Sequence, residues 1–414
     1  MSTGPRTTSD VIVVGGGLIG SAIAWRLAGA GRTVRMVVGE PGAAASRVAA
    51  GMLAPVTEIS FTEQALLPLN LASLGRYETF AAEVAEASGL PTGLSRTPTI
   101  SVAYDADDLA RLTTLKEFLD RIGLKAERLV SRDARRLEPL LSPQVRGGLL
   151  VDADWSIDNR LLWAAIGAAG RRAGVAEVDG FVHHVRRSGT QVSGVTLADG
   201  TELDAAVVVV ACGAWAGQLT GIDPLPVRPV KGQILRLDPR GLPQPSQTVR
   251  AITQGSEVYV VPRAGGREVV VGATVEEKGF DRGVTADGVY ELLRDARRVL
   301  PMTAEYALAE TTVGWRPGSP DNAPILGPGE LDGLVLATGH YRNGVLLTPV
   351  TADAISAYVL TGELPEEARA FTLERFATSH PTPPSPPSPA SSPPSSPTAS
   401  PPTSSPPAPE TVQL

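Results

Sequence analysis

The first forty residues of the chain alternate between strand-like and helix-like spacing of their hydrophobic positions. A β-branched run at 10–14 is followed by helical spacing at 18–29 and by a second apolar run at 33–38. Strands and helices that alternate in this order are typical of a parallel sheet flanked by helices. The pattern therefore predicts a strand–turn–helix–strand unit at the start of the chain.

The rest of the chain predicts more elements of both kinds. Continuous apolar runs at 207–210 and 333–338 are typical of strands buried on both faces of a parallel sheet. Short strands separated by turns between 226 and 275 predict an antiparallel sheet instead. Helical spacing predicts four longer helices, at 61–88, 105–122, 159–173 (capped by Asp158 or Asn159) and 347–360.

A glycine-rich turn joins the first strand to the first helix. Gly15, Gly17 and Gly20 form a G-x-G-x-x-G pattern in which the first glycine permits a tight turn, the second lets a pyrophosphate approach, and the third allows close helix–strand packing. The helix then offers free N–H groups to phosphate. An acid at the end of the second strand should bind the ribose. That position holds Val38, so Glu40 is the candidate.

These patterns together predict an α/β fold in two domains with a tail. The first is a discontinuous Rossmann-like nucleotide-binding domain, expected at 9–90, 145–225 and 310–377. The second is an α+β substrate-binding domain with a mainly antiparallel sheet, expected at 91–144 and 226–309. From Thr378 to Leu414 the chain is almost wholly Pro, Ser, Thr and Ala, which leaves too little apolar area for folding and predicts a disordered tail.

Charge and cysteine content narrow the function classes. The net charge of −7 and the absence of charge blocks argue against nucleic acid as a partner. One cysteine, Cys212, excludes a disulfide framework and a zinc cluster. The apolar run at 11–19 is interrupted by glycines and too short for a membrane span, and residues 1–9 lack a cleavage site. We therefore expect a cytoplasmic protein with no metal and no membrane contact.

Four further stretches carry a family resemblance. They are a run of small residues at 45–55 (A-S-R-V-A-A-G-M-L-A-P), V-V-V-A-C-G-A-W at 208–215, G-W-R-P-G-S-P-D-N at 314–322 and G-H-Y-R-N-G-V-L-L-T-P at 339–349. With the glycine loop, they resemble the D-amino-acid-oxidase family of FAD enzymes. Within that family the chain is most similar to the glycine oxidases of thiamine biosynthesis. The resemblance covers about residues 9–364. Val38 and the tail depart from it.

The resemblance implies that the dinucleotide is FAD and indicates which residues contact it. Val182 would pair its backbone with the adenine. Cys212 ends a buried strand, so we expect a small buried side chain and non-covalent FAD. The expected FAD contacts are Gly15, Gly17, Leu18, Ile19, Gly20, Glu40, Ser46, Arg47, Ala49, Ala50, Gly51, Met52, Val182, Cys212, Gly213, Trp215, His340, Arg342, Asn343, Gly344, Val345 and Leu346.

The substrate site should contain a cation and needs no strong base. Flavin oxidises an amine by accepting a hydride from its α-carbon, so the protein has to supply orientation and electrostatics. A carboxylate-bearing substrate requires a guanidinium, and Arg316 and Arg342 are the candidates. The resemblance favours Arg316 as the carboxylate clamp and Arg342 as a second contact. It also assigns Tyr259 as a donor to the carboxylate.

The favoured activity is oxidative deamination of glycine or a small amine such as sarcosine or D-alanine. Dioxygen would accept the electrons and give hydrogen peroxide. The imine would hydrolyse to glyoxylate and ammonia or pass to a thiazole synthase, and the resemblance implies a homotetramer. One alternative is a D-amino-acid or sarcosine dehydrogenase that reduces a quinone or carrier. Another is a non-catalytic flavin-binding module that acts through the Pro-rich tail.

Overall fold

The β-branched run at the start of the chain forms the centre of a parallel sheet. In the computed structural model, which describes residues 9–39, 45–263 and 265–379, strand β1 pairs in parallel with both β2 and β12. Strand β19 continues the sheet beside β12, and β9 continues it beside β2. The five parallel strands are β1 (Ser9–Val14), β2 (Val34–Val38), β9 (Ala176–Asp179), β12 (Glu202–Val210) and β19 (Leu334–Thr338). Residues 11–14 of β1 and 334–337 of β19 are apolar and buried, as expected of strands that are covered on both faces.

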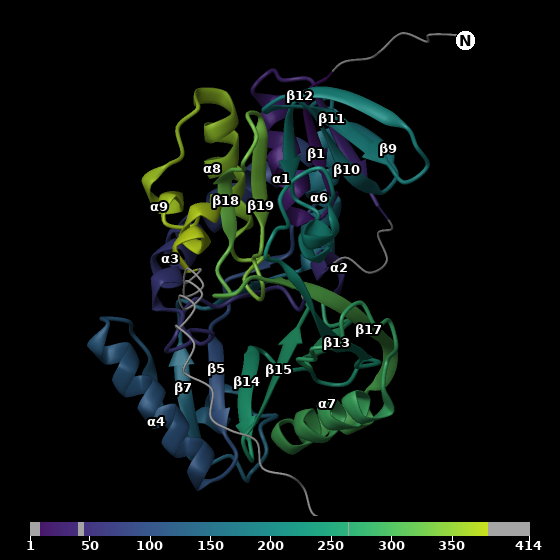
Figure 1. Cartoon of the computed structure of the whole chain (residues 1–414). Helices are drawn as coiled ribbons and strands as arrows, with labels where there is room; N and C mark the ends of the chain where they lie inside the picture. Colours follow the sequence, from purple (N-terminus) through teal and green to yellow (C-terminus); the bar gives the residue numbers. More distant parts are fainter. Residues whose placement is uncertain (1–8, 40–44, 264, 380–414) are drawn as a thin grey trace, which may run out of the picture. The chain divides into compact units, whose positions relative to one another are not determined.

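A layer of helices packs against this sheet and against one another (Figure 1). Helix α1 contacts α6 and α8, and α3 contacts the same two helices. Their apolar residues join those of the sheet in one core. The four helices are α1 (Leu18–Gly29), α3 (Leu67–Ser88), α6 (Asn159–Arg172) and α8 (Thr348–Thr361). Helix α1 matches its predicted bounds, α6 and α8 lie within one residue of theirs, and α3 begins six residues later than predicted.

Three antiparallel strands extend the first sheet. Strands β10 (Val182–Ser188) and β11 (Gln191–Leu197) continue it beyond β12, and β18 (Ile325–Pro328) pairs with β19. The mixed sheet nonetheless fits the predicted α/β class.

The second sheet is antiparallel at every strand pair except one. Only β14 and β5 run in parallel. Helices α7 (Ala286–Val299) and α4 (Ala106–Arg121) cover it, as Figure 1 shows. In spatial order its strands are β17 (Ala307–Gly318), β13 (Arg228–Asp238), β16 (Val269–Gly272), β15 (Ser256–Pro262), β14 (Thr248–Thr253), β5 (Thr99–Ala103), β7 (Gly147–Val151) and β6 (Glu127–Val130). The prediction of a mainly antiparallel second sheet is confirmed.

Two strands cross the predicted domain boundaries. The sequence pattern assigned 145–225 and 310–377 to the nucleotide domain, yet β7 and β17 pair within the second sheet. The division into an FAD-binding and a substrate-binding domain remains a prediction. Strand pairing by itself assigns these two strands to the second sheet.

The ends of two predicted helices are resolved by their first residues. Asp158, rather than Asn159, caps α6, because its carboxylate accepts from the N–H groups of Arg160 and Leu161 at 3.0 and 3.1 Å. The predicted helix at 61–88 divides into the 3₁₀ turn η2 (Gln64–Leu66) and α3, whose first turn contains Pro68. The shorter elements are α2 (Ala45–Val48), β3 (Met52–Leu53), β4 (Leu94–Ser95), α5 (Ser131–Leu137), β8 (Trp155–Ile157), η3 (Gly213–Gln218), η4 (Pro301–Glu305), α9 (Glu366–Arg369) and η5 (Leu373–Ser379).

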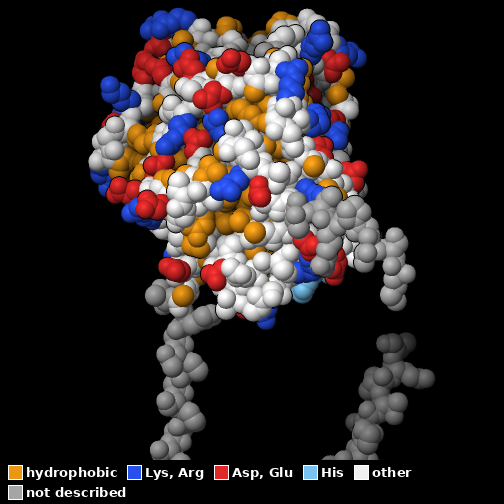
Figure 2. Space-filling model, turned by 90° about the horizontal axis from the view of Figure 1, so that it is seen from above, with side chains coloured by type: hydrophobic (Ala, Val, Ile, Leu, Met, Phe, Trp, Pro, Cys, Tyr) orange, Lys and Arg blue, Asp and Glu red, His pale blue; other side chains and the backbone are white. Residues whose placement is uncertain are grey.

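The end of η5 runs two residues into the predicted tail, and 380–414 lie outside the described residues. No helix in the described ranges is long and apolar enough to cross a membrane. Acidic and basic side chains are interspersed on the face seen in Figure 2. Basic side chains do not gather on that face into a patch that would attract a polyanion.

Candidate functional site

A cavity opens at the carboxyl ends of the central parallel strands. Its wall includes Val14 at the end of β1, Val38 at the end of β2, and Cys212 after β12. Ligands of open parallel sheets bind at these strand ends, where loops of several strands converge. The cavity continues to β13, β15 and β17 of the second sheet, which contribute Ile234, Tyr259 and Arg316, so its wall comes from both sheets.

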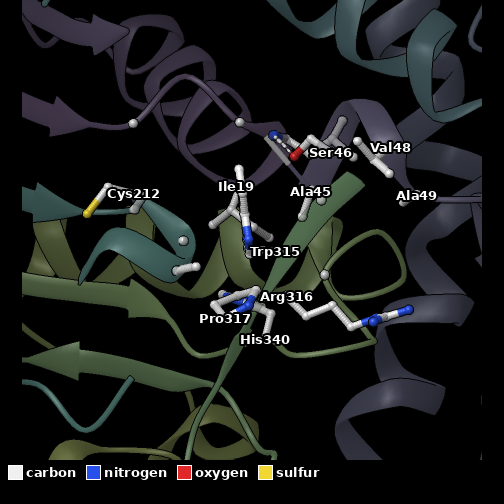
Figure 3. A pocket seen from close by; sticks show the side chains of 18 of the residues that line it. Ile19, Ala45, Ser46, Val48, Ala49, Cys212, Trp315, Arg316, Pro317 and His340 are labelled. Carbon is white, nitrogen blue, oxygen red and sulfur yellow. Dashed lines mark hydrogen bonds between the residues drawn. The ribbon is translucent and has the colours of Figure 1, made fainter. Parts of the chain in front are cut away.

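The glycine loop forms one end of this cavity. Gly15 has a φ of +114°, and a Cβ on it would lie 2.5 Å from the carbonyl oxygen of Ala211. A Cβ on Gly20 would lie 1.9 Å from the carbonyl oxygen of Gly15, so α1 starts in direct contact with the turn. Leu18 N donates to Ser46 Oγ at 2.9 Å, as seen in Figure 3. The bare loop and the start of α1 fit a pyrophosphate.

The predicted ribose acid remains undecided. Val38 lines the cavity and packs where a Cβ of Gly16 would stand, 2.8 Å from that position. It therefore supports the loop as an apolar contact and offers no acceptor. Glu40, the alternative acid, lies outside the described residues. Val182, the expected adenine contact, lines the same end of the cavity, next to Phe181.

The small-residue segment forms the adjoining wall. Ala49, Ala50, Gly51 and Met52 all line the cavity, together with Ser46 and Val48 of α2. Gly51 has a φ of +76°, and its carbonyl oxygen accepts from Ile157 N at 2.8 Å. Backbone with small side chains lets a flat, extended group lie close to the chain. The segment therefore fits an FAD molecule that continues from the glycine loop.

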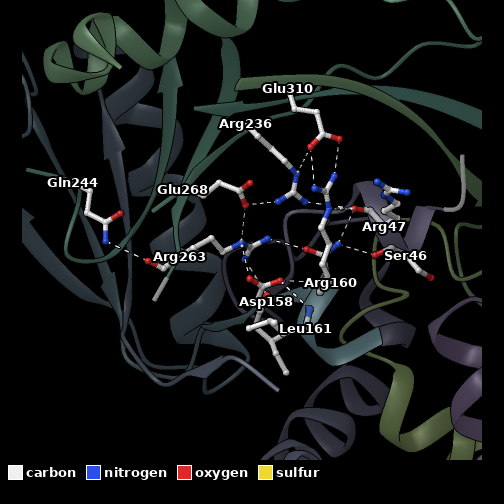
Figure 4. A network of polar contacts seen from close by, with 12 residues as sticks. Ser46, Arg47, Asp158, Arg160, Leu161, Arg236, Gln244, Arg263, Glu268 and Glu310 are labelled. Atoms are coloured by element: carbon white, nitrogen blue, oxygen red, sulfur yellow. Dashed lines mark hydrogen bonds and ion pairs between the residues drawn. The ribbon is translucent and has the colours of Figure 1, made fainter. Parts of the chain in front are cut away.

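A network of charged side chains holds α2 in place (Figure 4). Asn159 Nδ2 donates to the carbonyl oxygens of Ser46 and Arg47 at 2.7 and 3.1 Å. Arg160 donates to both carboxylate oxygens of Glu310 on β17, at 2.9 and 2.8 Å. Arg263, directly after β15, donates to Asn159 Oδ1 at 2.8 Å. The wall of the cavity is thus bonded to the second sheet by charge-assisted hydrogen bonds.

The other end of the cavity carries the predicted substrate residues. Tyr259 and Arg316 are half-buried in its wall, and Arg342 is more exposed. Burial raises the pKa of Tyr259 to about 12, although the nearby charge of Arg316 opposes the rise. The phenol therefore stays protonated and can donate a hydrogen bond at neutral pH. The fold brings together three residues that are far apart in the sequence.

Charge pairing distinguishes the two predicted arginines. Arg342 Nη2 lies 3.4 Å from Glu63 Oε2, so its charge already has a carboxylate partner. Arg316 Nη1 donates to the backbone carbonyl oxygens of Thr274 at 3.1 Å and Lys231 at 3.4 Å. Among the described residues no carboxylate forms an ion pair with Arg316. An incoming carboxylate would therefore find an uncompensated cation at Arg316.

Neither His340 nor Cys212 is suited to acid–base or nucleophilic chemistry at neutral pH. His340 is buried, its Nε2 lies 3.0 Å from Thr351 Oγ1, and burial lowers its pKa to about 3. Burial likewise raises the pKa of the Cys212 thiol to about 12, so the reactive thiolate is scarce. Cys212 is partly exposed toward the cavity, where the sequence analysis expected full burial.

Several expected FAD contacts do not line the cavity. Gly20 acts through packing against Gly15, and the Arg47 carbonyl oxygen belongs to the network beneath α2. Asn343 and Leu346 are buried beside the wall. Apart from Glu40, which lies outside the described residues, the remaining expected contacts do line it: Gly15, Gly17, Leu18, Ile19, Ser46, Ala49, Ala50, Gly51, Met52, Val182, Cys212, Gly213, Trp215, His340, Arg342, Gly344 and Val345.

The sequence analysis missed Glu58 and Trp315. Both line the cavity, Glu58 on the loop after the small-residue segment and Trp315 on β17. Trp315 packs edge-on against Trp215, and Phe280 stacks on Trp215. The position of Glu58 six residues after Met52 was the only available signal. No spacing rule marks a loop acid at that distance as part of a site.

Comparisons with known proteins agree with this geometry. The family model described as FAD dependent oxidoreductase (DAO) matches residues 10–358. The bifunctional protein ThiO/ThiG of Synechocystis sp. is 36% identical over 378 residues, which are 90% of this chain and 55% of that protein. The glycine oxidase of Geobacillus kaustophilus is 34% identical over 375 residues, which are 88% and 97% of the two chains. Its crystal structure matches with a TM-score of 0.80 at 32% identity, covering 89% of this chain and 99% of that one. The chain spans about half the length of the ThiO/ThiG proteins that it matches.

Proposed function

Because the chain belongs to the DAO family of FAD-dependent oxidoreductases, we propose that it oxidises the amino group of glycine or another small amino acid. Its cofactor is FAD, which when bound accepts a hydride from the substrate's α-carbon and is reoxidised by dioxygen. The products would be hydrogen peroxide and an imine, which hydrolyses to glyoxylate and ammonia. The names of the similar proteins, glycine oxidase and ThiO/ThiG, support this substrate and a link to thiazole synthesis.

The observation that carries the proposal is the guanidinium of Arg316, which pairs with no carboxylate in the described ranges. Such a cation, in the wall of a cavity, is electrostatically complementary to the carboxylate of an amino acid. Two parallel N–H donors of a guanidinium fix both oxygens of that carboxylate and so orient the α-carbon. Tyr259, protonated and half-buried, would donate to the same carboxylate, with Arg342 as an outer contact.

The glycine loop and the small-residue segment would hold the FAD. Bare backbone at Gly15 and Gly17, with the start of α1, would take the pyrophosphate. The wall at 49–52 would take the flat ring system. We expect non-covalent attachment, since the Cys212 thiol, whose pKa is raised to about 12, is a poor nucleophile.

Anaerobic flavin reduction tests the proposal. Glycine, sarcosine and D-alanine are mixed with the holoenzyme without oxygen, and bleaching of the flavin absorbance is followed. We expect glycine to reduce the flavin and, under air, to release hydrogen peroxide with no added acceptor. Turnover that needs an artificial acceptor would favour a dehydrogenase instead. A flavin that no amine reduces would leave only a binding module.

A further inference from the structure

Glu58 is an acid in the wall of the proposed substrate site to which the proposed function assigns no role. Its side chain is 14% exposed and lines the same cavity as Tyr259, Arg316 and Arg342. The charge of Glu58 acts on the pKa of both Tyr259 and Arg342, after the larger effect of burial. The carboxylate therefore lies among the groups that are proposed to receive the substrate.

Rigid contacts fix the backbone on which Glu58 stands. The preceding N–H groups, of Val56 and Thr57, donate to the fully buried carboxylate of Asp154 at 3.0 and 2.7 Å. Glu58 N donates to Ala54 O at 3.1 Å and closes a turn directly after the small-residue wall. Because these hydrogen bonds fix the backbone that leads to it, the Glu58 side chain keeps its position when a ligand binds.

One oxygen of the Glu58 carboxylate is committed and the other is available. Oε1 accepts from Arg250 Nη1 at 2.7 Å, and Arg250 is the cross-strand partner of Tyr259. In the part of the chain that the structure describes, Oε2 has no hydrogen-bond partner. The site thus presents a carboxylate oxygen without a donor and, at Arg316, a guanidinium without a carboxylate.

A ligand that carries both charges would satisfy both groups. An α-amino acid has its carboxylate and its ammonium on the same α-carbon, and an acceptor placed for an N–H discriminates against an analogue that lacks it. We propose that Glu58 recognises the substrate's amino group through Oε2 while Arg316 holds the carboxylate. The inference rests on the proposed function, and it assigns to Glu58 the preference for amines over hydroxy acids.

Glycolate provides the matched ligand, because it keeps the carboxylate of glycine and replaces the amine with a hydroxyl. Glycine affinity is taken from the concentration dependence of anaerobic flavin reduction, and glycolate affinity from the perturbation of the flavin spectrum. We expect Glu58→Gln to lower the affinity for glycine by about 10- to 100-fold, which is the effect of losing one hydrogen bond to a charged group. Glycolate should bind the variant as well as the wild type or better.

Glu63→Gln is the control, because it removes an acid from the same loop that pairs with Arg342 and does not line the cavity. It should change the two affinities by a similar factor. If Glu58→Gln weakens both ligands equally, or neither, the proposal for Glu58 is wrong while the oxidase activity stands. If wild-type enzyme binds glycolate but no amine reduces its flavin, the proposed function fails and the role of Glu58 falls with it.

Discussion

The two ends of the cavity are built in different ways. The nucleotide end is built on backbone and small side chains of the stretches 15–19 and 48–52, with Val38, Phe181 and Val182 beside them. The substrate end consists of long polar side chains from four distant places: Glu58, Tyr259, Arg316 and Arg342. Backbone shape is encoded locally by glycine spacing, whereas side-chain convergence depends on which strands become neighbours. FAD binding at the nucleotide end should therefore be most sensitive to added side-chain volume. Substrate binding at the other end should be most sensitive to the loss of a charge.

The steric dependence is tested most severely at Gly20. A Cβ there would lie 1.9 Å from the carbonyl oxygen of Gly15, so Gly20→Ala must displace the loop. We expect a cost at or above about 3 kcal/mol, the upper end for overpacking, and loss of bound FAD. The measurement is flavin absorbance after dialysis. Gly29→Ala is the control in the same helix: nothing lies within 4 Å of its Cβ position, so FAD should remain bound.

The charge dependence is tested at Arg316. Arg316→Ala should lower kcat/KM for glycine by roughly 30- to 5000-fold, since losing one partner of a desolvated charge pair costs about 2–5 kcal/mol. FAD should remain bound, because the nucleotide end is untouched. Steady-state kinetics gives kcat/KM for glycine, and the flavin absorbance spectrum shows whether FAD remains bound. Arg316→Lys keeps the positive charge but cannot form the bidentate contact, so its kcat/KM should lie between those of the wild type and the alanine variant. Wild-type kinetics in the alanine variant would contradict the clamp.

A smaller effect is expected at Tyr259. Tyr259→Phe removes one proposed donor to the carboxylate and leaves the ring in the wall. The loss should be about 1.5 kcal/mol, or roughly tenfold in KM, with kcat changed less. The KM and kcat values for glycine decide this. A tenfold drop in kcat at unchanged KM would show that Tyr259 acts on the chemical step.

The last expected effect is on stability rather than on activity, and it depends on pH at the loop where the two sheets meet. His340 bridges to Gly318 at the end of β17 and has a pKa lowered to about 3 by burial, below the usual value near 6.5. Below pH 6.5 the unfolded chain therefore binds a proton at His340, whereas the folded chain does not. The free energy of unfolding falls as the pH is lowered through this range. Between pH 6.5 and 5 wild type should lose about 2 kcal/mol relative to His340→Gln.

Urea unfolding of the two holoenzymes at both pH values measures this difference. Parallel pH curves for wild type and variant would mean that His340 takes up a proton in the folded state. Flavin absorbance through the same titration reports whether FAD is retained. A neutral His340 predicts retention over this range.

The fold was largely predictable because its elements are local. The bounds of α1 follow from apolar spacing between a glycine turn and a glycine end, and the strands at 207–210 and 334–338 follow from continuous apolar runs. Sheet membership was less predictable. Strands β7 and β17 gained their partners through contacts distant in sequence, which no local pattern records.

Adjacent residues specify the glycine loop, the small-residue wall and the arginines near a predicted flavin loop, so these features could be identified before the fold was known. Folding adds that Arg342 is paired with Glu63, whereas Arg316 lacks a carboxylate partner among the described residues. It alone brought Glu58 beside them. The reason is physical: whether a charge is satisfied depends on every group that surrounds it, and those groups come from strands and loops far apart in the chain.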